Sequence, residues 1–500
     1  MITNPPLALA LVAARKIDFD DAFCLQFLLT KNSELVVGNF ARKPAGEWTL
    51  YYGDGLPVIP LKDSNNDLVG YFLGIGVDEA GQLVSESFCK SLSQKTPNFL
   101  ETIEDAISKI AGRYIVILTN PQWERMYFDP CGTLSAVYNP QTKTVASSVM
   151  LCLDRDVKDN PDFNNDAVTS GEESYMLQNT RDVDVKLIIA NHYLDLKDFS
   201  MTRHWPKPDQ EFTATPEEYP EIAADIDKRL AEIFGAIVQS YKSVVPITGG
   251  VDSRNLIAAG KKNHKDVDLF FTFGHNFMSE NDTEVAEIIA EKLNVPFQAF
   301  DRRADETREL PKGFHKRQML YQYMIASGYS FVTPPEVQQD LLEYLPKGAV
   351  HLRGNVVDLL KDINFPKDFA TIKSAKKHRE IELRGLFRYR TPSDQELAKW
   401  MPTYMKWFKT LPKNAHKLSY DFKYMELSLP LSSQLFYGMS HNFYIYPFAD
   451  RRLIINAMRF PLSFRKSGNA ARYVLNASMP ELSDIPYLRE HINIKRAQNA

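Results

Sequence analysis

The chain is organised around the stretch Val244-Val245-Pro246-Ile247-Thr248-Gly249-Gly250-Val251-Asp252-Ser253-Arg254. Its apolar beginning, residues 244–247, predicts a short buried strand. Two glycines follow directly, and a run that is compatible with a helix then continues to Lys262. Strand, glycine turn and helix start form a geometry that cradles phosphate, because backbone N–H groups point inward and the helix N-terminus favours negative charge.

Asp252 lies inside this turn, where it would repel a phosphate unless a cation lay between them. It therefore indicates Mg²⁺ bound together with a nucleotide. The turn is not the common P-loop, because it lacks the pattern G-x-x-x-x-G-K-[ST] and no lysine stands at its end. The alternative is an ordinary Gly-Gly turn that meets a helix, with Asp252 and Ser253 acting as caps.

Length and composition limit the possible classes of protein. Five hundred residues exceed one usual domain, so two domains are expected. The 59 Lys and Arg against 63 Asp and Glu give a net charge of −4, without the basic excess that nucleic-acid binding requires. The cysteines lack metal-ligand spacing and are interpreted as reduced thiols of a cytoplasmic protein. They are Cys24, Cys89, Cys131 and Cys152.

The first part of the chain is predicted to be rich in strands. Residues 23–29, 48–52 and 114–118 are strand-like, whereas residues 99–110 carry helical periodicity. The apolar run 7–14 is too short to span a membrane, and we interpret it as a first strand rather than a signal peptide. No membrane partner is expected.

A linker is predicted at residues 206–213, which are polar and contain proline. Thr215, Pro216 and Glu218 then give the signature of a capping box at a helix start. One apolar face follows at helical spacing and should deliver the chain into the strand of the glycine loop. This face consists of Ile222, Ile226, Leu230, Ile233 and Ile237.

The sequence after the glycine loop alternates between strands and a helix. Residues 267–273 and 296–300 are predicted strands, and residues 279–293 form a helix between them. Strand, helix, strand, helix, strand indicates a parallel sheet covered on both faces, with ligands at the carboxyl ends of the strands. The side chains expected to point inward from residues 279–293 are Val285, Ile288, Ile289 and Leu293.

The glycine loop resembles the S-G-G-x-D-S loop of enzymes that split ATP into AMP and pyrophosphate. Thr248 keeps the hydroxyl of the first position, and Arg254 stands where close relatives often carry another serine. The order of short motifs in the first part of the chain is similar to the N-terminal domain of the asparagine synthetase family. These motifs are Gly112-Arg113-Tyr114, Asp129-x-x-Gly132, Tyr138 and Ala146-Ser147-Ser148.

This resemblance implies an α/β protein of two domains. Residues 1–206 would be a glutamine-amidotransferase-like αββα sandwich of the N-terminal-nucleophile type. Residues 214–500 would be a doubly wound parallel-sheet ATP pyrophosphatase domain. The family's glutaminase needs a cysteine directly after the initiator methionine, and this chain has Ile2 there. Cys24 cannot use its own α-amine as a base, so we expect a scaffold without glutaminase activity.

The resemblance also implies the residues that bind ATP. Phe273 and Gly274 match the strand whose backbone holds adenine in the family. Gly354 and Asp358 match its second phosphate segment, S-G-x-G-x-D-E. Departures in that segment are Arg353 for the serine, Val356 for the second glycine and Leu359 for the glutamate.

The predicted nucleotide site combines the glycine loop with the matching residues of the later segments. It consists of Thr248, Gly249, Gly250, Asp252, Ser253, Phe273, Gly274 and Gly354. Asp252 and Asp358 are its predicted Mg²⁺ ligands, and Arg353 is a predicted direct phosphate donor. The alternative for the segment around Arg353 is a strand end with solvated side chains.

Two further residues are predicted near the chemistry. Glu426 is a candidate carboxylate for the substrate pocket, with a structurally paired Glu as the alternative. Lys495 follows the motif Pro480-Glu481-Leu482-x-x-Ile485-Pro486. In relatives that make amides, a lysine after this point stabilises the negatively charged transition state. Lys466 is the competing candidate.

The implied activity is that of an ATP- and Mg²⁺-dependent amide ligase. A small-molecule or peptide carboxylate would be adenylated, and an amine, in the same or in a second molecule, would then displace AMP. β-Lactam synthetases, carbapenam synthetases and lasso-peptide cyclases are the analogues that lack the N-terminal cysteine. The alternatives are an asparagine-synthetase-like enzyme that uses free ammonia and a degenerate nucleotide-binding homologue without catalysis. Thiolation of a nucleic-acid base is disfavoured by the acidic charge balance and by the lack of cysteine in the second domain.

Overall fold

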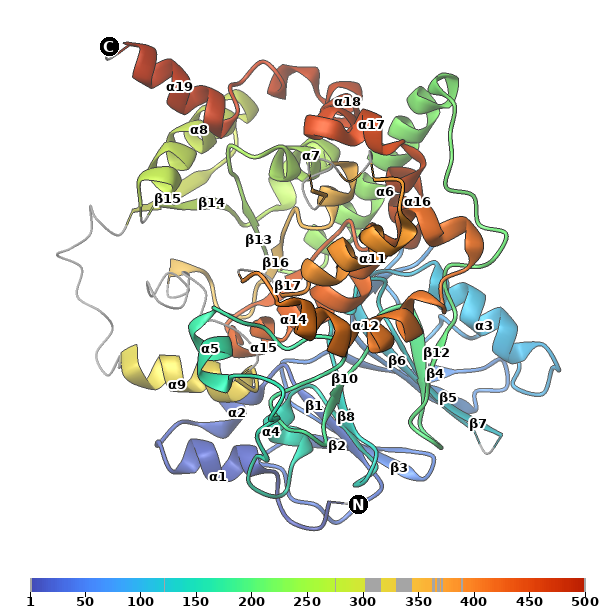
Figure 1. Cartoon of the computed structure of the whole chain (residues 1–500). Coiled ribbons are helices and arrows are strands. Elements are labelled where there is room, and N and C mark those ends of the chain that lie inside the picture. The colour runs from blue at the N-terminus through green and yellow to red at the C-terminus, as the bar shows by residue number, and fades with distance from the viewer. Residues whose placement is uncertain are drawn as a thin grey trace.

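The computed structural model describes all residues except 1, 121, 275, 302–315, 330–343, 362–364, 367–368, 370–371, 388–389 and 499–500. The protein is mixed α/β, with two antiparallel six-stranded sheets and one parallel five-stranded sheet. The antiparallel strands come from the first part of the chain and lie below the parallel sheet in the view of Figure 1. Within the described part, no helix has both the length and the apolar character that crossing a bilayer requires.

The antiparallel sheets use strands from residues 27–203. The first sheet has the order β10-β8-β9-β1-β3-β2 and the second β12-β11-β7-β6-β5-β4. The strands of the first sheet are β1 (Phe27–Thr30), β2 (Ala41–Ala45), β3 (Trp48–Tyr52), β8 (Val137–Asn139), β9 (Thr144–Ala146) and β10 (Lys186–Leu187). Those of the second are β4 (Val58–Lys62), β5 (Leu68–Val77), β6 (Ala111–Asn120), β7 (Trp123–Phe128), β11 (His192–Asp195) and β12 (Met201–Arg203).

The two antiparallel sheets share one hydrophobic core. Leu29 and Leu50 of the first sheet belong to the same buried cluster as Ile115 and Met126 of the second. Since side chains alternate between the faces of a strand, the neighbouring residues point outward. On the first sheet they pack against α1 (Leu7–Ala13) and α4 (Val149–Cys152), and on the second against α3 (Phe99–Ser108). The layers are therefore helix, sheet, sheet, helix.

The prediction of a first strand at residues 7–14 was wrong. This run forms α1, with Ala8 and Val12 buried one helical turn apart against the first sheet's cluster. Its sequence LALALVA consists mainly of residues with high helix propensity. In a helix, only the side chains on one face need to be buried. The predicted strand 23–29 is also shorter than expected, because α2 (Phe19–Phe23) runs into its beginning and β1 starts at Phe27.

The parallel sheet has the order β15-β14-β13-β16-β17. Its strands are β13 (Ser243–Pro246), β14 (Leu269–Gly274), β15 (Phe297–Asp301), β16 (Val350–Leu352) and β17 (Phe443–Ile445). The chain first proceeds outward from β13 to β15 and then returns to the other side of β13 as β16. The carboxyl ends of β13 and β16 therefore flank a point where strand order reverses, which is where open α/β sheets bind ligands.

Helices cover the face of this sheet that carries Val245 and Phe270. α6 (Tyr219–Val238), α7 (Val251–Ala259), α8 (Phe277–Leu293) and α18 (Asn469–Ser478) contribute to the same buried cluster. The predicted capping box at Thr215 is confirmed, and all five residues of the predicted apolar face of α6 are buried. Ile288 of α8 is 41% exposed, however, so its predicted inward position was wrong.

The remaining helices of the described residues lie around the sheets and near the end of the chain. They are α5 (Asn165–Ser170), α9 (Lys316–Ala326), α11 (Ala375–Arg384), α12 (Asp394–Phe408), α13 (Ser419–Lys423), α14 (Leu429–Ser433), α15 (Leu435–Gly438), α16 (Arg451–Arg459), α17 (Leu462–Arg465) and α19 (Leu488–Gln498). A π-helical turn, η8 (Tyr424–Ser428), joins α13 to α14. α19 packs along α8 at the end of the chain (Figure 1).

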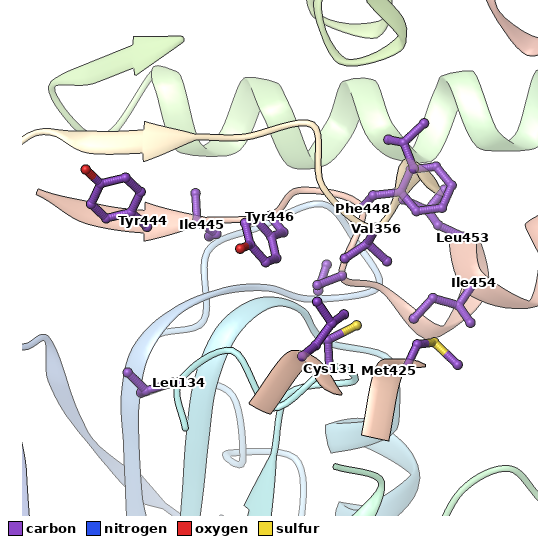
Figure 2. Packing of buried hydrophobic residues seen from close by; sticks show 14 of the residues in the cluster. Cys131, Leu134, Val356, Met425, Tyr444, Ile445, Tyr446, Phe448, Leu453 and Ile454 are labelled. Carbon is purple, nitrogen blue, oxygen red and sulfur yellow. The ribbon is translucent and has the colours of Figure 1, made fainter. Parts of the chain in front are cut away.

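Buried ion pairs and apolar contacts join the antiparallel sheets to the rest of the protein. Arg229 of α6 donates to Asp450 at 2.8 Å and to the carbonyl oxygen of Asp78 at 2.8 Å. Figure 2 shows Cys131 and Leu134 from the first part of the chain below Tyr446 and Phe448 from the last part. Arg203 of β12 and Glu426 of η8 form a buried ion pair between the two parts, and separating the parts would leave both charges unpaired.

Candidate functional site

A cleft of about 380 Å³ lies at the carboxyl ends of β13, β14 and β16. Most of the predicted site residues line it. These are Thr248, Asp252, Ser253, Phe273, Arg353, Gly354 and Asp358. The topology explains this meeting, because the loops after β13 and β16 follow neighbouring parallel strands and must emerge side by side.

The glycine loop connects β13 to α7 and is held by its own hydroxyls. The side chains of Thr248 and Ser253 are hydrogen-bonded at 2.8 Å, and Ser253 also reaches the carbonyl oxygen of Gly250 at 3.2 Å. The N–H of Gly249 donates to Oδ1 of Asp282 on α8 at 2.6 Å. A loop amide thus points to an anionic oxygen, which is the kind of partner that a phosphate would also provide.

Arg254 has a structural position, although it stands where a serine is frequent in the enzymes that this loop resembles. Its guanidinium is fully buried and donates to the carbonyl oxygens of Leu482, Ile485 and Pro486 at 2.9, 2.6 and 2.7 Å. It also lies 4.2 Å from the ring centroid of Tyr487. Arg254 therefore ties the loop helix to the segment before α19 and does not line the cleft.

The second segment keeps the backbone shape of a glycine-rich turn. A Cβ atom on Gly354 would lie 2.8 Å from the carbonyl carbon of Asp252, so only glycine allows this approach. Val356 adopts φ +72°, a left-handed conformation that a β-branched residue rarely takes. Its side chain is fully buried and lies next to Phe448 and Leu453 (Figure 2). Core packing therefore holds the turn in a shape that glycine would adopt without strain.

Asp252 and Asp358 face each other across the cleft, and Lys361 lies between them. Nζ of Lys361 is 2.5 Å from Oδ2 of Asp252 and 3.0 Å from Oδ1 of Asp358. Tyr424 donates to the other oxygen of Asp358 at 3.3 Å, whereas Oδ1 of Asp252 is buried without a partner among the described residues. Burial, followed by repulsion from Asp358, raises the pKa of Asp252 to about 6 even though Lys361 acts to lower it.

The carboxylate pair fits Mg²⁺ in the type of its ligands, because Mg²⁺ prefers carboxylate oxygens and binds through one or two of them plus substrate phosphates. Burial lowers the pKa of Lys361, but the two carboxylates outweigh burial and raise it above the ordinary value. An ammonium group therefore balances part of the negative charge of the pair. Nowhere in the described part do three or more His, Cys, Asp or Glu side chains form a group that could hold a metal on its own.

Several lining residues were not predicted from the sequence. Asp282 and Ser279 come from the start of α8, and His351 and Asn355 flank the end of β16. His351 is uncharged near neutral pH, since burial and then the charge of Arg353 hold its pKa well below the usual range. The approach of Asp282 to the loop and of Lys361 to the carboxylates depends on tertiary packing. In the sequence, only the position of Asp282 and Lys361 near predicted strand ends could have indicated a place in the site.

The structure places Glu426 outside the cleft. Its carboxylate is fully buried and accepts hydrogen bonds from the two terminal guanidinium nitrogens of Arg203, at 2.6 and 2.7 Å. The indole N–H of Trp407 donates to it at 2.8 Å and the amide of Asn191 at 3.2 Å. Every carboxylate oxygen is engaged by the surrounding protein. Glu426 is therefore a structurally paired residue between the two parts of the chain, and its assignment to the substrate pocket is corrected.

Lys495 also lies outside the cleft. It belongs to α19 and contacts both carboxylate oxygens of Glu284 on α8, at 2.7 and 2.9 Å. Lys466, the competing candidate, is exposed and is not part of the cleft lining. Gly274 pairs with Asp301 in the sheet beside the cleft. Among the described residues, the cations that meet at the cleft are Arg353, which lines it, and Lys361, which binds its two aspartates.

The cysteines lie away from the cleft in settings that disfavour the thiolate. Cys24 donates to the carbonyl oxygen of Ser440 at 3.6 Å, and burial is the main reason why its pKa rises to about 11. Burial also raises the pKa of Cys89, Cys131 and Cys152. Since the thiolate is the reactive form, none of these residues has the environment of a nucleophile.

Comparisons with known proteins add no family assignment. No protein-family model matches the chain. No curated protein matches it either. The functional argument therefore rests on the cleft and its residues.

Proposed function

We propose that the protein is an ATP-dependent, AMP-forming carbon–nitrogen ligase. The observation that carries this proposal is the meeting of the Thr248–Ser253 loop and the Arg353–Asp358 segment in one cleft at the switch point of a parallel sheet. Loop amides and a helix start suit phosphate oxygens. The two aspartates beside them suit a cation that accompanies phosphate.

Each residue of the cleft has a role in the proposed reaction. The loop and the beginning of α7 bind the phosphates, and the hydroxyls of Thr248 and Ser253 keep the loop in shape or donate to phosphate oxygens. Arg353 neutralises the pyrophosphate as it leaves. Mg²⁺, held by Asp252 and Asp358 when bound, would supply further charge neutralisation. The substrate carboxylate attacks the α-phosphorus, and the acyl-AMP that forms must be shielded from water until the amine displaces AMP.

The architecture of the first part of the chain fits the proposed relationship. Its helix, sheet, sheet, helix layering is the one expected for an amidotransferase-like domain of the N-terminal-nucleophile type. The high thiol pKa values support a scaffold role without glutamine hydrolysis. The amine would then be ammonia or a substrate amine, as in asparagine-synthetase-like enzymes or in enzymes that close lactams and peptide rings.

One observation favours a second candidate, a nucleotide-binding protein without catalysis. Neither Glu426 nor Lys495 reaches the cleft, so the described lining lacks the residues predicted for amide formation. This candidate predicts that ATP binds and is not cleaved.

ATP–pyrophosphate exchange tests both candidates. The full-length protein is incubated with ATP, Mg²⁺ and labelled pyrophosphate while amino acids and peptides with free carboxylates are screened. Exchange that depends on one acid supports the ligase, and profiling amines with that labelled acid then separates ammonia from a tethered amine. Measurable ATP affinity with no exchange for any acid would contradict the ligase and support the binding protein.

A further inference from the structure

Lys361 lies between Asp252 and Asp358, the two predicted metal ligands. Its ammonium nitrogen contacts one oxygen of each carboxylate, at 2.5 and 3.0 Å. The side chain of Lys361 is only 13% exposed, so this ion triad is largely shielded from water. A metal ion and the ammonium group cannot both occupy the gap at these distances.

The chain itself brings Lys361 to this position. Asp358 belongs to the 3₁₀ turn η5 (Val357–Leu360), and Lys361 ends that turn with its N–H on the carbonyl oxygen of Asp358 at 2.9 Å. The lysine and one of its carboxylates are therefore neighbours along the same turn. The segment is anchored below, because Leu359 and Leu360 are buried in the core and Arg465 donates to the carbonyl oxygen of Leu359 at 2.8 Å.

We propose that Lys361 is a built-in counter-ion that excludes free divalent metal from the aspartate pair until a triphosphate binds. This inference rests on the proposed nucleotide site. Without a nucleotide, the ammonium group neutralises the pair and Mg²⁺ must displace it. With a triphosphate in the cleft, the ammonium group gains phosphate oxygens as new partners, and the carboxylates become available to the metal.

The consequence is positive coupling between metal and nucleotide. Binding of either ligand requires the ammonium group of Lys361 to move from the aspartates to the phosphate oxygens. Once one ligand has caused this move, the other binds at a lower free-energy cost. Metal alone binds weakly, and triphosphate alone is held by Lys361 and Arg353. Lys361 thus makes the site bind the metal–nucleotide complex in preference to the free metal ion.

The test measures Mn²⁺ binding to the full-length protein without nucleotide, by electron paramagnetic resonance of the free ion. Replacing Lys361 by Met removes the competing charge, and we expect Mn²⁺ to bind at least about tenfold more tightly than to the wild type, because a unit charge about 3 Å from each carboxylate is lost. Lys361→Arg keeps the charge and should bind Mn²⁺ as weakly as the wild type.

Two controls locate the effect. Lys261→Met removes another partly buried lysine, which bonds Ser478 and lies near Asp227, and it should leave Mn²⁺ affinity unchanged. Asp252→Asn added to Lys361→Met should abolish the gain. Equal Mn²⁺ affinity of the wild type and Lys361→Met, or a gain of equal size in Lys361→Arg, would overturn the proposal.

A comparison of the wild type with Asp252→Asn also provides a test that does not depend on how Lys361→Met folds. If the ammonium group blocks the pair, the wild type and Asp252→Asn should bind Mn²⁺ equally weakly without nucleotide. A tight Mn²⁺ site in the wild type that Asp252→Asn abolishes would overturn the proposal. These readouts use metal alone, so failure of the ligase function would appear separately, as absent pyrophosphate exchange with the Mn²⁺ results unchanged.

Discussion

Replacement of Glu426 by Gln distinguishes its two interpretations. From the sequence, this carboxylate is a candidate for a substrate pocket with a structurally paired Glu as the alternative, and the structure buries it against Arg203, Trp407 and Asn191. Glutamine keeps the shape of the side chain but removes its charge and presents N–H groups to a guanidinium. The structural interpretation therefore predicts a loss of stability, and the catalytic one a loss of activity in a protein that stays stable.

The expected loss follows from the burial of the pair. Glu426 is fully buried and Arg203 is 8% exposed, so solvent cannot replace the lost partner. Removing one partner of a buried ion pair costs about 3–5 kcal/mol. The entropy of unfolding is about 2.1 cal/mol/K per residue, or roughly 1 kcal/mol/K for 500 residues. Unfolding in one transition would then occur about 3–5 °C lower.

Differential scanning calorimetry of the full-length protein measures this shift. Asp394→Asn is the matched control, because Asp394 pairs with Arg384 while its own side chain is completely exposed, and it should leave the melting temperature unchanged. An unchanged melting temperature for Glu426→Gln, together with abolished pyrophosphate exchange, would refute the structural interpretation and return Glu426 to the active site.

Three further predictions concern the cleft and the thiols. Asp252→Asn and Asp358→Asn should each lower the rate of pyrophosphate release by about 10²–10³-fold. The double variant should lose little more, because the two carboxylates act as one unit. Pyrophosphate release is measured across a Mg²⁺ titration, and a normal rate in Asp358→Asn would contradict the pairing. Gly354→Ala should lower pyrophosphate release by about 10²-fold, because the added Cβ would press on the backbone of the glycine loop at Asp252. Calorimetric titration with ATP should show weakened binding, and unchanged ATP binding would contradict this reason. Alkylation of Cys24 should be slow at pH 8 and rise about tenfold per pH unit up to pH 10, because a raised pKa leaves little thiolate until pH approaches about 11; rapid labelling at pH 7, measured by mass spectrometry, would contradict it.

Local sequence signals predicted much of the parallel-sheet region. The capping box at Thr215 and the regular apolar spacing of α6 are both confirmed, since each depends on residues within a few positions of one another. The run that forms α1 was misread because an apolar segment of seven residues fits a buried strand or a helix equally well by pattern. Ile288 was misplaced because the apolar stripe of α8 is narrower than its sequence suggests.

The cleft was predicted only in part. Residues in the two loops could be found because each loop follows a strand and has its own glycine pattern. Lys361, Asp282 and His351 could not be assigned, because their roles arise from contacts between segments distant in sequence or from burial. Glu426 illustrates the converse, since a buried carboxylate looks the same in sequence whether its partner is a substrate or Arg203.

The turn around Val356 departs from the resembled S-G-x-G-x-D-E pattern but has the backbone shape of a glycine turn. Val356 keeps a left-handed backbone that costs a non-glycine residue about 1–2 kcal/mol. Gly354 keeps the close approach to Asp252, and Leu359 extends the buried surface beneath the turn. A segment without a role could relax this strain by an ordinary turn. The strained shape, with Lys361 directed at both aspartates, therefore agrees better with the proposed phosphate site than with a segment that has no role.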